Sequence, residues 1–115
     1  MTPWRVSLNS IDVVVLEPEP RLYAQLDGLI DTVRENSNQD VVLDFSAVGM
    51  LTTSGISRLM TLRSLLDGSG HRLILCQVRT AVKGIFAVTG LDMVLEFAER
   101  RDDALSAIRP MHNAH

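Results

Sequence analysis

The 115-residue sequence contains a single cysteine, Cys76, and only 4% aromatic residues. One cysteine excludes an intramolecular disulfide and a metal site built from several cysteines. Because Cys76 ends the apolar run 73–76, we expect a buried structural thiol rather than a reactive one. With few aromatic rings available, aliphatic side chains must build the core.

The chain also lacks a strong excess of charge and any long hydrophobic run. Its formal net charge of −3 gives no electrostatic support for nucleic acid or an anionic membrane as a partner. No apolar run approaches the roughly 18 residues that a membrane-spanning helix needs, and residues 1–5 lack the layout of a signal peptide. We therefore expect a soluble, cytoplasmic protein without direct membrane insertion. Its length fits one domain, and no linker or repeat divides residues 1–115.

Apolar periodicity predicts alternating strands and helices. The first two strands should pair antiparallel, with Trp4, Val6 and Leu8 on a buried face, and the later strands should be parallel with right-handed helix crossovers. Pro110 should stop the last helix and residues 111–115 should fray. The result is an α/β fold with a mixed four- to five-stranded sheet flanked by about four helices. The expected strands are about 4–8, 11–16, 41–45, 71–77 and 93–97, and the expected helices about 21–36, 54–67, 80–89 and 102–108.

The stretch 41–56 joins a buried strand to a run of small hydroxyl residues. Thr52, Thr53 and Ser54 stand at the expected start of a helix, directly before Gly55. Hydroxyl oxygens suit this place because they can accept hydrogen bonds from the unpaired N–H groups of the first turn. Asp44, at the end of the strand, is expected to bind backbone amides of the following loop and so to help hold the hydroxyl residues in position.

The same residues do not predict a catalytic serine. A nucleophile elbow needs glycine two residues on either side of Ser54, but Thr52 and Ile56 occupy these positions. His71 is expected to begin a strand, and the segment 68–70 follows a helix and precedes a strand, the reverse of a dinucleotide-binding loop. We therefore expect no enzyme, no cofactor and no metal site.

Four segments, in their order and spacing, resemble the STAS domain, named for sulfate transporters and anti-sigma factor antagonists. The resemblance covers about residues 11–108 and implies a mixed sheet flanked by helices. It also implies a bacterial anti-sigma factor antagonist, which binds a serine-kinase anti-sigma factor, is phosphorylated by it and is restored by a serine phosphatase. The phosphorylated residue precedes the motif glycine, which matches Ser54 here, with Thr53 as the fallback. The segments are 41–46 (VVLDFS), 51–56 (LTTSGI), 70–75 (GHRLIL) and 89–92 (TGLD).

The sequence departs from the family pattern in two places. The motif usually reads Asp-Ser-Ser-Gly, and Thr52 stands where the acid would be. The strand ending near residue 16 usually leads into a Gly-acid-Leu turn, whereas this chain has Glu-Pro-Glu-Pro at 17–20. Arg58 lies on the polar side of the helix, as part of a solvated face or as a contact for an acidic partner. The residues assigned to the partner-binding loop are Asp44, Thr52, Thr53, Gly55 and Arg58.

The missing acid at Thr52 favours a second interpretation from a different class. The chain would then be a STAS subunit that is not phosphorylated, a structural or regulatory component of a lipid-transport ATPase or a signalling scaffold complex. The sequence leaves the oligomeric state open, although an edge strand near the N-terminus leaves room for pairing between chains.

Overall fold

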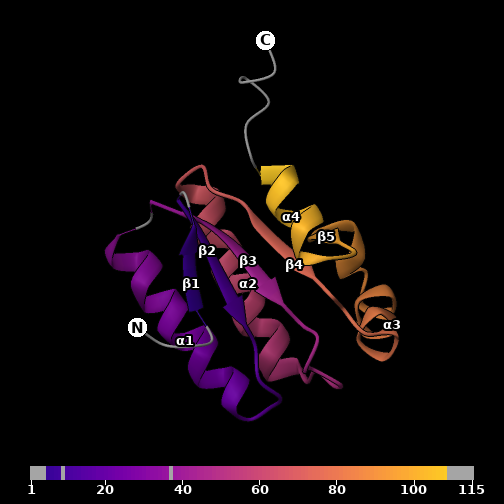
Figure 1. Ribbon diagram of the computed structural model, residues 1–115. Coiled ribbons are helices and arrows are strands. Elements are labelled where there is room, and N and C mark those ends of the chain that lie inside the picture. Colours follow the sequence, from indigo (N-terminus) through magenta and orange to yellow (C-terminus); the bar gives the residue numbers. More distant parts are fainter. Residues whose placement is uncertain (1–4, 9, 37, 109–115) are drawn as a thin grey trace.

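The computed structural model describes residues 5–8, 10–36 and 38–108. The expectations for Trp4, Pro110 and residues 111–115 lie outside these residues. The strands are β1 Arg5–Leu8, β2 Ile11–Val15, β3 Asp40–Asp44, β4 Leu73–Cys76 and β5 Glu96–Ala98, and the helices are α1 Arg21–Glu35, α2 Thr53–Gly68, α3 Thr80–Thr89 and α4 Arg101–Ile108, with a 3₁₀ turn, η1, at Leu91–Met93 (Figure 1).

One five-stranded sheet runs through the molecule in the order β1-β2-β3-β4-β5. β1 pairs antiparallel with β2, whereas β2, β3, β4 and β5 pair in parallel. The predicted antiparallel pairing of the first two strands and the predicted parallel pairing of the later ones are confirmed. Since parallel strands point the same way, the loops that follow β3 and β4 leave the sheet at the same edge, where Asp44 is the register partner of Cys76.

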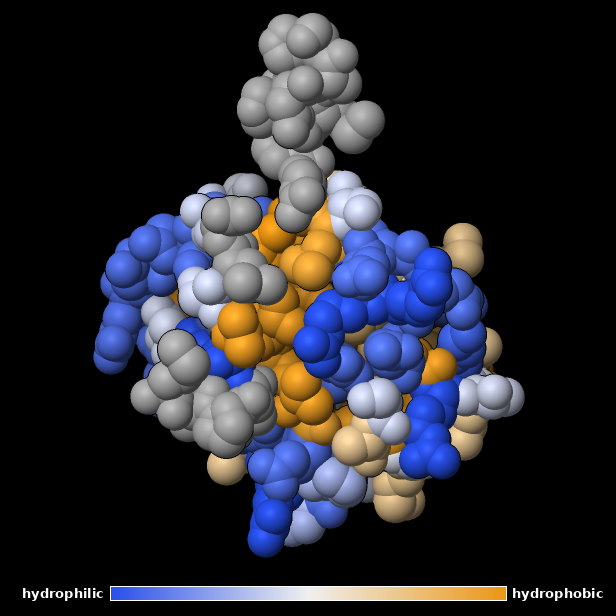
Figure 2. All heavy atoms as spheres, in the orientation of Figure 1, coloured by the Kyte–Doolittle hydropathy of each residue, from blue (hydrophilic) through white to orange (hydrophobic). Residues whose placement is uncertain are grey.

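Helices cover both faces of the sheet, which explains the almost continuous apolar runs of β3 and β4. Leu43 and Leu75 belong to the larger core, which also takes residues from α1, α2 and α3. Val42 and Cys76 point to the opposite face and join the smaller core with Ala104 of α4. Figure 2 looks onto the face that carries α4, where apolar side chains show beside that helix. The buried Cys76 thiol agrees with the prediction.

Two expectations about strands at the edges of the sheet are wrong. Val6 is 40% exposed because it lies opposite Val13 on the face of α4, and α4 packs chiefly against β3, β4 and β5 instead. The last strand begins three residues later than predicted. Gly90 takes a left-handed conformation (φ 78°), and the chain then makes the turn η1, with the Leu95 N–H donating to the Leu91 carbonyl at 2.9 Å.

Candidate functional site at the start of helix α2

The site lies where the chain leaves β3 and enters α2. Thr52 is the residue before the helix, and Thr53, Ser54 and Gly55 form its first turn. Leu51 is only 5% exposed and anchors the end of the loop in the core, whereas Thr53 and Ser54 are exposed. Within the described residues, no hydrogen bond engages the Ser54 hydroxyl. The loop therefore presents one free, accessible serine at a helix N-terminus.

The neighbouring Thr52 is held by groups from a distant part of the sequence. Its backbone N–H and its hydroxyl both donate to Oε2 of Glu19, at 2.9 and 3.0 Å. The Tyr23 hydroxyl donates to the other oxygen of Glu19 at 3.0 Å and lies 2.8 Å from the Thr52 hydroxyl. Thr52 makes no side-chain capping bond to the helix, so the predicted capping role is wrong. The carboxylate is a strong, charged acceptor, and the Thr52 hydroxyl donates its hydrogen bond to it.

The motif glycine is required by this network. A Cβ atom at Gly55 would lie 2.7 Å from Leu51 Cδ1 and 2.8 Å from Glu19 Oε2, both shorter than real contacts of a Cβ. The Leu51 side chain is buried, and the Glu19 carboxylate is fixed by its hydrogen bonds, so neither can retreat freely. Gly55 thus allows the close approach of Glu19 to α2.

Arg58 places a positive charge one turn after Ser54. Its Nε donates to Asp27 at 2.9 Å, and its Nη1 donates to the Ser54 carbonyl at 3.1 Å. The guanidinium carbon lies 4.6 Å from the centre of the Tyr23 ring, within the range of a cation–π contact. The Arg58 side chain keeps 31% of its surface exposed. Arg58 is therefore positioned beside Ser54 and still open to a ligand.

Asp44 serves a different part of the molecule. One oxygen accepts the Ser46 N–H at 2.8 Å, the expected bond to the following loop, and the other accepts from Arg101 of α4 at 2.7 Å. Burial alone would raise the pKa of Asp44, but the Ser46 N–H and the Arg101 guanidinium together hold this pKa below its ordinary value. Asp44 thus ties the end of β3 to α4, and its hydrogen bonds do not reach the hydroxyl residues at 52–54.

A serine–histidine pair is excluded for the described histidine. His71 Nδ1 lies 3.2 Å from Asp40, the first residue of β3, so His71 sits at the opposite edge of the sheet from the site. Helix α2 separates it from Ser54, and its 16 residues span about 24 Å. Among the described residues, no group of three His, Cys, Asp or Glu side chains could hold a metal ion.

Sequence reasoning missed three residues of the site: Glu19, Tyr23 and Asp27. They lie 29 to 33 positions before the residues that they contact, Thr52 and Arg58. The one available signal was the Glu-Pro-Glu-Pro segment at 17–20, which departs from the family pattern just as Thr52 does. The structure brings the two departures into direct contact.

The comparisons with known proteins agree with this architecture. The model of the STAS domain family matches residues 23–104, and the chain therefore belongs to the STAS domain family. No curated protein sequence matches it. Across the helices of the described part of the chain, none has the length and apolar character needed to cross a membrane.

Solved structures share the fold over nearly the whole chain. TM1081 of Thermotoga maritima is 13% identical, with a TM-score of 0.81 over 92% of this chain and 93% of that chain. A serine-to-glutamate variant of RsbS from Moorella thermoacetica is 18% identical, with a TM-score of 0.79 over 95% and 96%. The phosphorylated form of the Bacillus cell fate determinant SpoIIAA is 17% identical, with a TM-score of 0.68 over 90% and 96%. At these identities the similarity establishes the fold.

Proposed function

We propose that the chain is an anti-sigma factor antagonist, which binds a serine-kinase anti-sigma factor and is released by phosphorylation of Ser54. The observation that carries the proposal is the free Ser54 hydroxyl in the first turn of α2, one turn before the Arg58 guanidinium. Thr53 is also exposed and is the fallback acceptor, whereas the Thr52 hydroxyl is engaged by Glu19. The protein would act by binding, without catalysis of its own, in the cytoplasm, and a serine phosphatase would restore it.

A phosphate on Ser54 would suit the domain itself. It would lie at the positive end of the α2 dipole, where negative charge is stabilising. Ser54 and Arg58 are four residues apart on one helical face, so the guanidinium could turn from Asp27 to the phosphate. The modified protein should therefore stay folded, and the modification would act on the partner.

The partner would meet about −1.5 to −2 new charges at its contact surface. Two unit charges ~4 Å apart interact by about 4 kcal/mol at an effective dielectric constant of 20. Since about 1.4 kcal/mol is a tenfold change in affinity, one acidic group on the partner facing Ser54 would suffice for release. The exposed face of α2 next to Ser54 offers room for such a partner, in a shallow depression lined by Ser57, Met60, Thr61, Ser64 and Leu65.

Glu19 would supply the acid that the motif lacks. Its carboxylate binds both the N–H and the hydroxyl of Thr52, so a negative charge lies beside the motif although residue 52 is neutral. A kinase that requires an acidic group two residues before the serine would then contact the Glu19 carboxylate, which lies beside residue 52 although it is distant in the sequence. SpoIIAA, which shares the fold, is known in a phosphorylated form, which supports phosphorylation as a modification that this fold accepts.

The test is intact-mass spectrometry after incubation with ATP and each candidate serine-kinase anti-sigma factor from the same genome. The wild-type chain should gain one phosphoryl group, and Ser54→Ala should gain none. Thr53→Ala and Thr80→Ala, the latter at the matching start of α3, should be modified like the wild type. A phosphoryl group that persists in Ser54→Ala and is lost in Thr53→Ala would move the site to the fallback residue.

The alternative class has its own outcome in the same experiment. If no candidate kinase modifies the chain and it instead co-purifies stably with a transporter ATPase or a scaffold subunit, the protein is a structural STAS subunit. The neutral Thr52 favours this alternative, and the Glu19 carboxylate against Thr52 weighs against it.

A further inference from the structure

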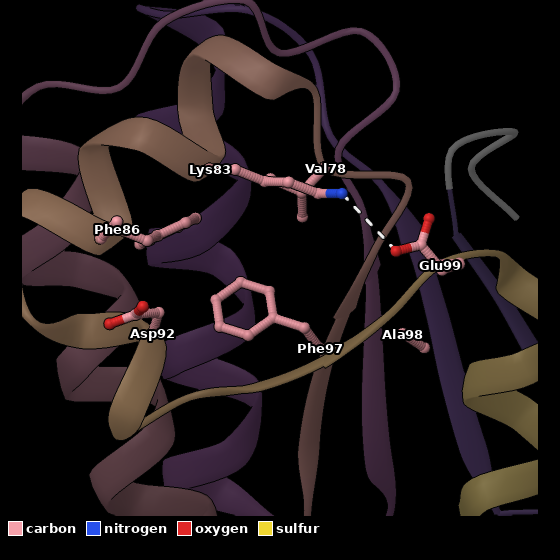
Figure 3. Close-up of a pocket in the computed structure, with 8 residues that line it drawn as sticks. Val78, Lys83, Phe86, Asp92, Phe97, Ala98 and Glu99 are labelled. Carbon is pink, nitrogen blue, oxygen red and sulfur yellow. Dashed lines mark ion pairs between the residues drawn. The ribbon is translucent and has the colours of Figure 1, made fainter.

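A second, unassigned concave surface lies between α3, η1 and β5. It encloses about 410 Å³, within the usual range of ligand-binding pockets. Figure 3 shows the Phe97 ring in the middle of this groove, with Lys83 on one side and Asp92 on another. The lining residues are Val78, Lys83, Phe86, Ala87, Asp92, Phe97, Ala98 and Glu99.

The floor of the groove is aromatic and incompletely covered. The ring centres of Phe86 and Phe97 lie 5.3 Å apart in an edge-to-face arrangement, and Phe86 is buried while Phe97 stays 37% exposed. Exposed apolar side chains also lie on the same elements, Val88 of α3 at 89% and Met93 of η1 at 87% exposure. A small ligand that filled the cavity would leave these side chains in water, so the surface suits a longer, macromolecular occupant.

The charges around the groove favour a cation. Two carboxylates, Asp92 and Glu99, and one ammonium, Lys83, line the groove. Lys83 Nζ already lies 3.6 Å from Glu99, whereas Asp92 has no ion-pair partner among the residues that the structure describes. The unneutralised group at the groove is therefore the Asp92 carboxylate. A lysine or arginine of a partner would complement it.

The backbone beside the groove can receive an extended chain. β5 is the last strand of the sheet and pairs only with β4, so its other edge is unpaired within the described residues. An extended segment can add to such an edge through main-chain hydrogen bonds, while pockets on the sheet select its side chains.

We propose that this groove binds an extended segment of a partner protein in which an apolar side chain and a lysine or arginine stand two positions apart, on the same face of the strand. The apolar side chain enters the groove over Phe97, and the basic side chain pairs with Asp92. This second interaction surface is separate from the Ser54 site and does not depend on the proposed phosphorylation.

The test is titration of the ¹⁵N-labelled full chain with the peptide acetyl-TKVWVKT-amide, followed by NMR. Saturable shifts confined to residues 78–99 are expected. A twin peptide with glutamate for both lysines should bind at least about tenfold more weakly, the effect of roughly 1.4 kcal/mol of charge repulsion. Equal binding of the two peptides, or shifts located at residues 52–58, would overturn the proposal.

Three variants locate the contact. Asp92→Asn should abolish most of the preference for the basic peptide, and Val88→Lys should weaken its binding. Both positions are exposed, so neither substitution threatens the fold. Met50→Lys, at an apolar position 63% exposed on another loop, is the control and should bind like the wild type. Unchanged binding in both groove variants would refute the site, and concentration-dependent shifts of the same residues without peptide would assign the surface to a second copy of the chain.

Discussion

Two consecutive strand–helix units of this protein have the same local structure but differ in the contacts made at the start of the helix. β3–α2 and β4–α3 each combine a short buried strand, a loop and a helix whose first residue is a threonine, Thr53 or Thr80. In the first unit Glu19 and Tyr23 reach across from α1 and its preceding loop to bind Thr52. In the second unit the residue before the helix is Arg79, and among the described residues no side-chain hydrogen bond engages Arg79 or Thr80. The same local sequence pattern therefore forms both strand–helix units, but only the first unit has a distant carboxylate, Glu19, bound at the start of its helix.

The residues that end the two strands also differ, because one is charged and the other is neutral. Asp44 and Cys76 are register partners, and both are buried. Hydrogen bonds from the Ser46 N–H and Arg101 outweigh burial at Asp44 and lower its pKa, so the carboxylate stays charged. Burial and the neighbouring Asp44 charge raise the pKa of Cys76 to about 11, so the thiol stays neutral. Equal burial therefore has opposite consequences, and the available partners decide which.

The largest expected effect is the slow reaction of the Cys76 thiol with alkylating reagents. With a pKa of about 11 instead of about 8.5, the thiolate fraction near pH 8 falls by about 100-fold or more, and burial adds a steric barrier. Alkylation of the native protein should be slower than that of the denatured protein by at least this factor. Comparable rates in the two states would show that the β4–α3 unit opens readily, against the buried geometry.

The next effect concerns the first unit and rests on the proposed function. Ser54→Asp adds a charge where the phosphate would be, and binding to the anti-sigma factor should weaken by about tenfold or more. Ala81→Asp adds the same charge at the matching place, the exposed second residue of α3, and should change the affinity much less. Isothermal titration of both variants would settle whether the two helix starts differ in partner contact, and equal losses would break the comparison.

The features that could be predicted from the sequence are those set by residues close together along the chain. Strand and helix order, the parallel pairing and the buried Cys76 follow from periodicity, because burial on both faces leaves a pattern within a few residues. The start of β5 was placed too early because the left-handed Gly90 starts a 3₁₀ turn that the apolar residues 93–95 do not reveal.

The site was only half visible for the same reason. Thr52, Ser54 and Gly55 stand in one short motif, but Glu19 lies 33 residues away from Thr52. Hydroxyls at a helix start predict capping, and nothing local indicates that a carboxylate from another loop accepts the hydrogen bond of the Thr52 hydroxyl. The network becomes predictable only when α1 is known to pack beside α2.

Glycine substitutions in α2 and α3 should change the free energy of unfolding by about 1 kcal/mol, in opposite directions. Gly55→Ala forces a Cβ against Leu51 and Glu19 and should destabilise the protein by about 1–2 kcal/mol. Gly84→Ala, inside α3 with no atom within 4 Å of the new Cβ, should stabilise it by about 0.5–1 kcal/mol. Denaturant unfolding measures both values. A stabilising Gly55→Ala would mean that Glu19 moves away at little cost.

A double-mutant cycle then tests whether Glu19 is the reason. In a Glu19→Ala background one of the two close contacts at Gly55 is absent, so Gly55→Ala should cost less than in the wild type. The coupling should amount to about 0.5–1 kcal/mol. Additive effects would assign the whole cost to Leu51.

The smallest expected effect is the pH dependence that Asp44 contributes. Its pKa in the folded state lies below the ordinary value of 3.8, so the stability provided by the charged carboxylate is present above about pH 4 and is lost as the pH falls through the folded pKa. Asp44→Asn should therefore lower the melting temperature near neutral pH and flatten its decline below about pH 4. Asp67→Asn, which removes an exposed ion pair with Arg63, should leave the decline unchanged, since such pairs contribute little. If both variants flatten it equally, general surface charge rather than the bond between β3 and α4 governs acid unfolding.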